Sequence, residues 1–367
     1  MMLRGQGPDI GKFRIGIRHR RSSIFYYRNR SRRDAATLRR TARKTWPFCF
    51  AVAAIMLGII HSASLWAQDI AISYPGLTGE SSSLWMAREG GFFKENGIEA
   101  KLVYMEGGRL SIQSLLSGST QFMAGDAVSA LTAVAGGADV ILLASAKNVL
   151  PYVFAVSKDV KRFQDLKGKV VGISQIGGRA GEIARMVVKN SGLDPDKDVN
   201  YLAVGGTMSR LAALSGGRVQ AAPISRGIVP LAEEKGLRVL EVEPIPLIID
   251  ALWTTRKYAE ENADVINRAV RAYVASIAAI LKDKPKTLDV LRKYMRTTDM
   301  KALQSSYDVY VKGLDKVPIP NDQAIQNTLD ITYRIAPKLA GMDIKKHFYF
   351  APVQRLKEEG YIDQLYK

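Results

Sequence analysis

Short apolar runs and helix-like amphipathic stretches alternate along the chain from residue 70 onward. Residues 110–117 place Ile112, Leu115 and Leu116 at helical spacing. Residues 70–74 are apolar until Tyr74-Pro75-Gly76, where proline and glycine favour a turn. Runs typical of strands lie at residues 70–74, 98–105, 122–124 and 140–144. This repeated strand–helix order predicts an α/β fold with a largely parallel sheet that is covered by helices on both faces.

The same order starts again about 100 residues later. Residues 170–174 are predicted to form a strand, followed by a glycine-rich loop at 175–181 and a helix at 182–189. The segments GGRLSIQSLLSG at 107–118 and GGTMSRLAALSG at 205–216 share six of twelve positions at one constant offset. Common loop residues could produce such similarity by themselves. Our preferred interpretation is two lobes of similar topology, which can clamp a ligand between them.

Two extended runs suggest where the lobes are joined. Residues 152–157 and 247–254 are apolar and are interpreted as the crossings between the lobes. We therefore expect lobe 1 to comprise residues 68–153 with 250–367, and lobe 2 to comprise residues 154–249. Beyond residue 257 the chain turns helical, with a clear apolar face over residues 263–282.

The positive charge of the chain is concentrated at its beginning. Residues 1–67 contain 14 lysines and arginines and two acidic residues, which is +12 of the +18 net charge. An apolar run at 46–60 follows the basic stretch, and Ala67 offers a signal-peptidase site. Residues 1–67 are therefore predicted to be a basic leader plus signal peptide, cleaved after Ala67, and the protein to be exported to the periplasm. A retained N-terminal membrane anchor is the alternative. The remaining chain is only mildly basic, so no nucleic-acid partner is expected.

The scarcity of cysteine and histidine argues against several kinds of chemistry. The single cysteine, Cys49, lies in the apolar run of the leader, and only His347 lies beyond residue 67. A thiolate nucleophile or a site with several histidine ligands is therefore not expected in the exported part, and a serine triad would depend on His347 alone. We predict a binding protein, not an enzyme, with no catalytic residue, no metal and no cofactor.

Several longer segments resemble one family. They are the strand ending in YPG, AREGGFFKENGIEAKLV, LLSGSTQFMAGD, DLKGKVVGIS and HFYFAPVQRLKEEGYID. In this order they resemble the nitrate/sulfonate/taurine-type substrate-binding proteins of bacterial ABC transporters, over nearly all of residues 68–367. The resemblance implies a type II periplasmic-binding-protein fold, with two α/β lobes, a ligand cleft and two hinge crossings. It also implies a monomer that delivers a small molecule to an ABC permease/ATPase complex.

Two other functions remain open for the same fold. A related branch includes pyrimidine-precursor-binding and synthesis proteins, although the synthetic enzymes depend on histidine and cysteine clusters that this chain lacks. A periplasmic sensor of the same fold would have no role in transport. Sequence alone does not separate these alternatives.

The resemblance also implies a set of ligand-binding residues, since ligands contact the loops at the carboxyl ends of strands. Carried over position by position, the set is Tyr74, Gly76, Ser82, Ser83, Gly108, Arg109, Gly125, Asp126, Ser145, Lys147, Gly178, Arg179, Gly206, Thr207, Ser225 and Arg226.

Several of these residues also have a structural interpretation. The glycines suit turns, and Ser82, Ser83 and Asp126 suit helix N-caps. Arg109 and Arg179 follow glycine pairs at predicted helix starts, where the helix dipole favours anions. With Lys147 and Arg226 they favour an anionic ligand. The acidic residues Glu80, Glu106 and Asp126 leave a zwitterion or a cation possible.

Overall fold

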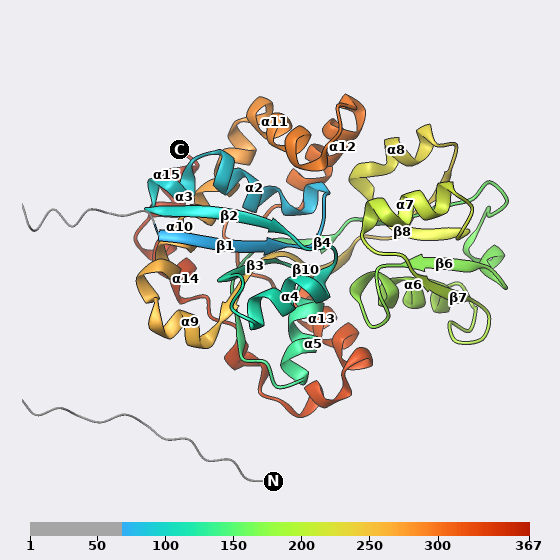
Figure 1. The fold of residues 1–367 in the computed structure, drawn as a ribbon, viewed down its shortest axis with the longest axis horizontal. Coiled ribbons are helices and arrows are strands. Elements are labelled where there is room, and N and C mark those ends of the chain that lie inside the picture. Colours follow the sequence, from blue (N-terminus) through green and yellow to red (C-terminus); the bar gives the residue numbers. More distant parts are fainter. Residues whose placement is uncertain (1–67) are drawn as a thin grey trace, which may run out of the picture. The chain divides into compact units, whose positions relative to one another are not determined.

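The computed structural model describes residues 68–367, so the predicted leader and the cleavage site after Ala67 lie outside the described residues. Two five-stranded sheets organise this part of the chain (Figure 1). We name the part built on the first sheet lobe 1 and the part built on the second lobe 2. The first sheet has the order β2 (Ile98–Tyr104), β1 (Gln68–Tyr74), β3 (Phe122–Gly125), β10 (Ile245–Thr255) and β4 (Val140–Leu150). The second has the order β7 (Asn200–Ala203), β6 (Val170–Ile173), β8 (Ala221–Ser225), β5 (Tyr152–Val156) and β9 (Arg238–Leu240).

Each sheet is largely parallel, as predicted, but one strand in each runs against the other four. In lobe 1, β1 runs parallel to β2 and β3, but β10 is antiparallel to both β3 and β4. In lobe 2, β6 is parallel to β7 and β8, and β5 is antiparallel to β8 and β9. The antiparallel strands are those next to the passages between lobes. The chain leaves lobe 1 at Pro151, between β4 and β5, and returns through residues 241–244, between β9 and β10.

Helices cover both faces of each sheet, as predicted. The helices are α2 (Ser82–Glu89), α3 (Phe92–Glu95), α4 (Gly108–Leu116), α5 (Ala127–Ala135), α6 (Arg179–Asn190), α7 (Thr207–Ser215), α8 (Val229–Glu234), α9 (Arg256–Glu261), α10 (Ala263–Lys282), α11 (Lys284–Met295), α12 (Met300–Val311), α13 (Asp322–Ile335), α14 (Ala351–Glu358) and α15 (Tyr361–Leu365). Short 3-10 turns are η1 (Gly79–Ser81), η2 (Phe163–Leu166), η3 (Arg226–Ile228), η4 (Pro337–Gly341) and η5 (Ile344–His347).

Alternation along the strands of lobe 1 divides its apolar residues between two cores. On β4, Ile141 and Leu143 pack with α2 and α10, whereas Val140 and Leu142 pack with α4, α5 and α13. This division follows from the strand period, because successive side chains point to opposite faces of a sheet. In lobe 2, α6 lies on one face and α7 with α8 on the other. The layers hold the loops at the strand ends in fixed positions.

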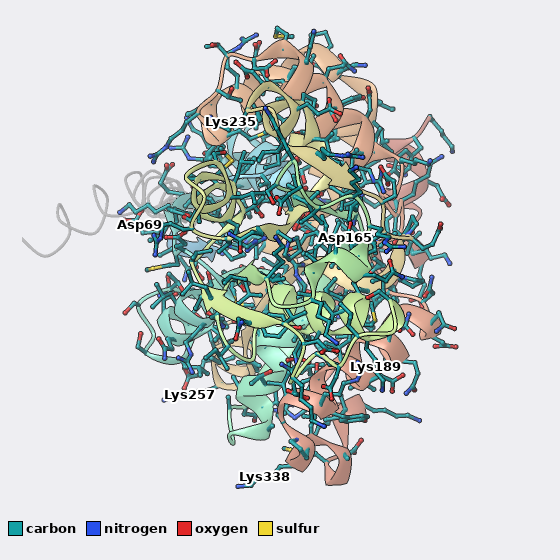
Figure 2. The ribbon with its side chains drawn as sticks, turned by 90° about the vertical axis from the view of Figure 1, so that its right-hand side faces the viewer. Asp69, Asp165, Lys189, Lys235, Lys257 and Lys338 are labelled. Atoms are coloured by element: carbon teal, nitrogen blue, oxygen red, sulfur yellow. The ribbon has the colours of Figure 1, made fainter. Side chains whose placement is uncertain are left out.

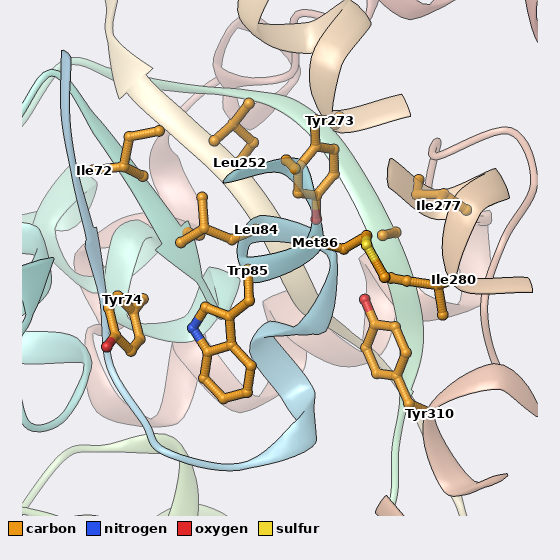
Figure 3. Packing of buried hydrophobic residues seen from close by; sticks show 14 of the residues in the cluster. Ile72, Tyr74, Leu84, Trp85, Met86, Leu252, Tyr273, Ile277, Ile280 and Tyr310 are labelled. Carbon is orange, nitrogen blue, oxygen red and sulfur yellow. The ribbon is translucent and has the colours of Figure 1, made fainter. Parts of the chain in front are cut away.

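The core of lobe 1 contains a cluster of aromatic residues beside α2. Trp85 is fully buried, stacks on Tyr294 with 4.9 Å between ring centroids and meets Tyr74 edge to face. Figure 3 shows Tyr74 and Trp85 on one side of α2, and Tyr273 and Tyr310 on the other with their hydroxyls pointing toward one another. Aromatic pairs of this geometry contribute roughly 0.5–1.5 kcal/mol beyond the area they bury. The cluster fixes α2 against the sheet.

Charged side chains lie around the outside of the described part. The labelled Asp69, Lys189, Lys235, Lys257 and Lys338 are exposed and lie at separate places in Figure 2. Within residues 68–367, no helix combines the length and the apolar character needed to cross a membrane. His347 is buried, and its Nδ1 donates to the carbonyl of Val140 at 2.7 Å. That contact gives this histidine a structural role.

Candidate functional site: a polar cavity between the lobes

A polar cavity lies where loops of both lobes meet. From lobe 1 it is lined by the loops after β1, β2 and β3, and by Ile249 and Asp250 of β10; from lobe 2 it is lined by Tyr152 of β5 and by the loops after β6 and β7. The space between the protein atoms is about 670 Å³ when the open mouth is included, and about 70 Å³ of space is open to the centre of a water molecule. A cavity of this size and polarity suits a small polar ligand.

Four helices begin at this cavity. Their first turns or N-caps contribute Gly108 from α4, Asp126 from α5, Arg179 from α6 and Thr207 from α7. The N-caps of α4, α6 and α7 are glycines, which have no side chain to bind the free N–H groups. Helix N-termini carry a partial positive charge, so together they favour a negatively charged group in the cavity.

Glycine is required at Gly108 because two helices approach closely there. A Cβ atom at this position would lie 2.0 Å from Oγ of Ser129 and 3.3 Å from Oδ2 of Asp126. The preceding Gly107 has a φ of +82°, a conformation that residues with a side chain rarely adopt. Asp126 caps α5 by accepting from the backbone N–H of Ser129 at 3.1 Å. The Gly-Gly pair therefore lets the start of α4 approach the capped start of α5.

Arg179 forms the main contact across the cavity. Its Nη2 donates to Oε2 of Glu80 and to the hydroxyl of Tyr152, both at 3.1 Å. Glu80 belongs to lobe 1, whereas Arg179 and Tyr152 belong to lobe 2. Burial opposes the charge of Arg179, but the nearby negative charges, including those of Asp126 and Glu80, outweigh burial and raise the pKa of its guanidinium. Arg179 is therefore charged and held across the gap between the lobes.

One side of each partner in this ion pair is left free. Among the described residues, Nη1 of Arg179 and Oε1 of Glu80 are buried and have no hydrogen-bond partner. Leaving a buried polar atom unpaired costs roughly 1–3 kcal/mol, and more for a charged group. A ligand in the cavity that donates to Glu80 and accepts from Arg179 would remove both costs.

Arg210 is a lining residue that sequence reasoning missed. It is only 2% exposed, and its three side-chain nitrogens donate to the carbonyl of Pro223, the carbonyl of Gly205 and the hydroxyl of Thr207, at 2.7 to 3.0 Å. Burial lowers the pKa of Arg210. The residue fixes the start of α7. Its signal in the sequence is an arginine on a helix face that otherwise buries Leu211 and Leu214.

Asp250 is the second lining residue that sequence reasoning missed. It is 2% exposed, and its carboxylate accepts from the hydroxyls of Tyr273, at 2.9 Å, and of Tyr310. Burial raises its pKa from 3.8 to about 6. Its sequence signal is a single acidic residue inside an otherwise apolar strand, a position where carboxylates are rare.

A second contact crosses between the lobes outside the cavity. Glu106, which follows β2, accepts from the backbone N–H of Gly206 at 2.8 Å and from the hydroxyl of Ser209. A carboxylate of lobe 1 thus occupies the N-terminus of α7 in lobe 2. This is the position where an anion is most favourable.

Half of the sixteen residues predicted from the sequence line the cavity. They are Gly76, Gly108, Gly125, Asp126, Gly178, Arg179, Gly206 and Thr207. The other eight lie away from it and have different contacts. They are Tyr74, Ser82, Ser83, Arg109, Ser145, Lys147, Ser225 and Arg226.

The predicted residues that lie elsewhere in lobe 1 serve the core of that lobe. Tyr74 belongs to the aromatic cluster. The Ser82 hydroxyl donates to the carbonyl of Gly79 at 2.6 Å, and the Ser83 hydroxyl bonds that of Tyr310. Ser145 donates to Oδ1 of Asn148 at 2.6 Å. These hydroxyls stabilise turns and packing.

The predicted cations outside the cavity have their own partners. Nζ of Lys147 donates to two carbonyls at the end of α12, at 2.7 and 2.9 Å, and burial lowers its pKa to about 8. Lys147 and Ser225 line a separate small space. Arg226 pairs with Glu241 on the surface of lobe 2. Arg109 is exposed and lines an outer groove. Arg179 is the one predicted cation that reaches the cavity.

The fold and the cavity define a class of protein. Two α/β lobes joined by two crossings, with a polar cavity between helix N-termini, constitute the periplasmic-binding-protein fold. The chain belongs to the NMT1/THI5-like family, whose model matches residues 79–287.

Known proteins similar to this chain agree with that class. "Putative binding protein YtlA" of Bacillus subtilis (strain 168) is 23% identical over 246 residues, which are 65% of this chain and 74% of that protein. The alkanesulfonate-binding protein SsuA of Xanthomonas axonopodis pv. citri, solved with bound MOPS, has a TM-score of 0.63 at 19% identity, covering 77% of this chain and 98% of that one. The nitrate-binding protein NrtA of Synechocystis has a TM-score of 0.62 at 10% identity, covering 80% and 89%. At these identities the solved structures establish the fold alone.

Proposed function

We propose that this protein is an exported solute-binding protein of an ABC importer. It captures a small anionic or zwitterionic ligand between its lobes and delivers it to a permease/ATPase complex at the inner membrane. It acts as a periplasmic monomer, without catalysis and without a cofactor. The lobes of this proposal are those built on the two sheets, with the passages at Pro151 and residues 241–244; the sequence suggests residues 68–153 with 250–367, and residues 154–249, which differ by the few residues next to each passage.

The main support for the proposal is the ion pair in the cavity, in which each partner has one polar atom without a hydrogen bond in the described part of the chain. Arg179 and Glu80 approach from different lobes, and each presents a buried polar atom that has no partner within residues 68–367. A permanent structural ion pair would satisfy these atoms, because buried ionic groups without hydrogen bonds are costly. A ligand bound between the lobes would complete the pair and favour the closed arrangement.

The residues proposed to contact ligand are the eight predicted residues that line the cavity, together with Glu80, Arg210 and Asp250. The helix N-termini and Arg179 support an acidic group on the ligand. The names of two structural neighbours, an alkanesulfonate-binding and a nitrate-binding protein, are consistent with such a group. The polar walls argue against a large apolar ligand.

A binding experiment with a matched pair of variants tests the proposal. Residues 68–367 are titrated calorimetrically with nitrate, ethanesulfonate, 2-aminoethanesulfonate, 3-aminopropionate and orotate. At least one compound is expected to bind and to raise the unfolding temperature. Arg179→Gln should weaken that binding by about 10- to 100-fold, the loss of a hydrogen bond to a charged group. Arg226→Gln, which removes a surface cation outside the cavity, should leave it unchanged.

The outcomes separate the alternatives. Equal weakening by both variants would show that general charge, not the cavity, attracts the ligand. If every compound fails to bind and no small molecule accompanies the protein purified from its native host, the proposal is wrong. Delivery to a permease is tested separately, by uptake of the identified ligand in host cells that lack the gene. Unchanged uptake there would favour a sensor.

A further inference from the structure

Two grooves on the outside of the protein meet at the loop after β6. The outer groove that contains Arg109 runs between α4 and α5 of lobe 1, which pack side by side (Figure 1). A second groove lies between α6 of lobe 2 and the end of α13 of lobe 1. Ile176, Gly177 and Ile335 border both grooves. Residues of both lobes therefore form one surface, which lies outside the ligand cavity.

The walls of the outer groove are one face of α4 and one face of α5. Ile112 and Leu116 of α4 lie four positions apart, so they share one face of the helix. Thr132, Ala133 and Gly136 follow the same spacing on α5. Leu116 is 45% exposed. A wall of small residues opposite a wall with isoleucine and leucine leaves room for apolar side chains of another amphipathic segment.

Ile176 adds an apolar side chain where the two grooves meet. Among residues 68–367 it is the most exposed large apolar residue, at 83%. A Cβ atom at Gly177 would lie 3.2 Å from Cγ2 of Ile335, so the loop rests closely on α13 and leaves the Ile176 side chain in solvent. Single exposed apolar residues are common on proteins. Here Leu116 and Met186 line the same two grooves, and an apolar surface of several residues is typical of a binding site.

Positive charge borders both grooves. Four cations line them: Arg109 in the outer groove, and Arg185, Lys189 and Arg334 in the second groove. Glu182 is the one carboxylate among the described residues that line either groove. Arg185 is paired with Asp196, whereas the other three cations are exposed and belong to none of the ion pairs within residues 68–367. Cations beside apolar walls are complementary to a segment that carries carboxylates beside apolar side chains.

We propose that the two grooves form a docking surface for an acidic amphipathic segment of a partner protein. Its apolar side chains lie between α4 and α5 and against Ile176, and its carboxylates lie beside the three cations without an ion pair. The grooves enclose about 1070 and 1440 Å³ with their open mouths, against about 670 Å³ for the cavity, which suits several side chains of a protein. A flat lipid surface would not reach the residues between α4 and α5. The inference goes beyond the proposed function, because it does not depend on what the cavity binds.

Photo-crosslinking in the native host tests the inference. Ile176→benzoylphenylalanine and Leu116→benzoylphenylalanine are each expected to crosslink to the same protein, through a segment with carboxylates beside apolar residues that mass spectrometry identifies. Tyr349→benzoylphenylalanine is the matched control, because Tyr349 is also an exposed large apolar residue but lines neither groove. Crosslinking at the two groove positions no stronger than at Tyr349 overturns the inference. Products formed only with lipid, with a second copy of this chain or with segments that lack acidic residues overturn it as well.

Charge reversal then tests the role of the cations. A synthetic peptide of the crosslinked segment is titrated by fluorescence anisotropy against the protein purified from its host. Arg109→Glu and Arg334→Glu should each weaken binding at least about fivefold, and added salt should weaken binding to the unmodified protein. Arg226→Glu, which reverses a surface cation outside both grooves, should leave the affinity unchanged. Equal affinities of all three variants, or equal weakening in all three, contradict the inference.

The two proposals fail in different ways. Arg109 and Arg334 line no part of the cavity, so the variants at these positions should bind the cavity ligand as the unmodified protein does. Loss of peptide binding alone in these variants supports the docking surface. Absence of any crosslinked partner, with ligand binding retained, overturns the docking surface and leaves the proposed function intact. A crosslinked acidic partner in a protein that binds no small molecule overturns the proposed function alone.

Discussion

Asp250 shows how burial defines the properties of a single residue in this protein. The carboxylate lies at the cavity wall on β10 and receives hydrogen bonds from Tyr273 and Tyr310, with Ser83 bonded to the same Tyr310 hydroxyl. These bonds lower its pKa, but the effect of burial is larger and raises the pKa to about 6. Lys147 is a buried cation whose charge interacts with that of Asp250. Asp250 therefore changes charge in a pH range where ordinary carboxylates are already ionised.

This shift predicts how stability depends on pH. Between pH 3.8 and about 6, the folded protein holds a proton on Asp250 that the unfolded chain releases, so this residue's stabilising contribution falls as pH rises through that window. A shift of this size corresponds to about 3 kcal/mol. Asp250→Asn should remove this component. Urea unfolding of both proteins at pH 4, 5, 6 and 7 measures the difference in unfolding free energy, and parallel pH curves would contradict the assignment.

At the level of single residues, the sequence could not predict which charged side chains lie in the cavity. Arg109 and Arg179 both follow glycine pairs at helix starts, yet one lies on the outside and the other in the cavity. Both helices begin at the cavity, but Arg179 is the first residue of α6 whereas Arg109 is the second residue of α4. Successive residues of a helix lie about 100° apart around its axis, so the two side chains leave their helices in different directions.

Asp250 was missed because its partners, Tyr273 and Tyr310, come from distant segments. Arg210 was missed because spacing alone does not show that an arginine is buried. Burial of a charged side chain is a property of the fold, whereas spacing reveals only which face of an element a residue occupies.

At the scale of elements, local patterns predicted most of the fold. The apolar face over residues 263–282 matches α10, and the strand runs at 98–105, 122–124 and 170–174 match β2, β3 and β6 to within one residue. The predicted run at 140–144 was too short, since β4 continues to Leu150 through polar residues. The antiparallel direction of β5 and β10 was missed. The alternation of apolar and polar residues shows which side chains of a strand lie on which face of the sheet. The direction of a strand depends instead on the path of the chain between the lobes.

The approach of α4 to α5 gives a testable prediction at this scale. Gly108→Ala would place a Cβ atom 2.0 Å from Oγ of Ser129, so the two helix starts would have to separate. Overpacking of this kind costs about 1–3 kcal/mol. We expect lower stability in urea unfolding and weaker ligand binding, because the α4 terminus lines the cavity. Gly341→Ala is the control: a Cβ atom there meets nothing within 4 Å. Equal stability of the two variants would show that the helix contact is looser than described.

For the whole described molecule, two carboxylates of lobe 1 hold the lobes together. Glu80 reaches Arg179 inside the cavity, and Glu106 reaches the start of α7 outside it. Ser306 of α12 adds a third contact by donating to the carbonyl of Gly227 at 3.1 Å. Each contact across the hinge stabilises the closed arrangement by its own free energy and no more. Each contact therefore makes its own contribution to the free-energy difference between the open and closed arrangements.

Glu106 permits a test of that equilibrium without altering the cavity. Glu106→Gln replaces a charged acceptor at the α7 terminus with a neutral one, which should cost about 1 kcal/mol of closed-state stability and shift the open-to-closed ratio about fivefold. Small-angle X-ray scattering of ligand-free residues 68–367 should then give a larger radius of gyration for the variant, and saturating ligand should restore the unmodified value. Glu89→Gln is the matched control, since Glu89 bonds Lys293 and Tyr294 within lobe 1 and should leave the radius unchanged. An unaltered radius in Glu106→Gln would mean that Glu106 does not hold the lobes closed, and closure would then depend on Arg179, Ser306 and the ligand.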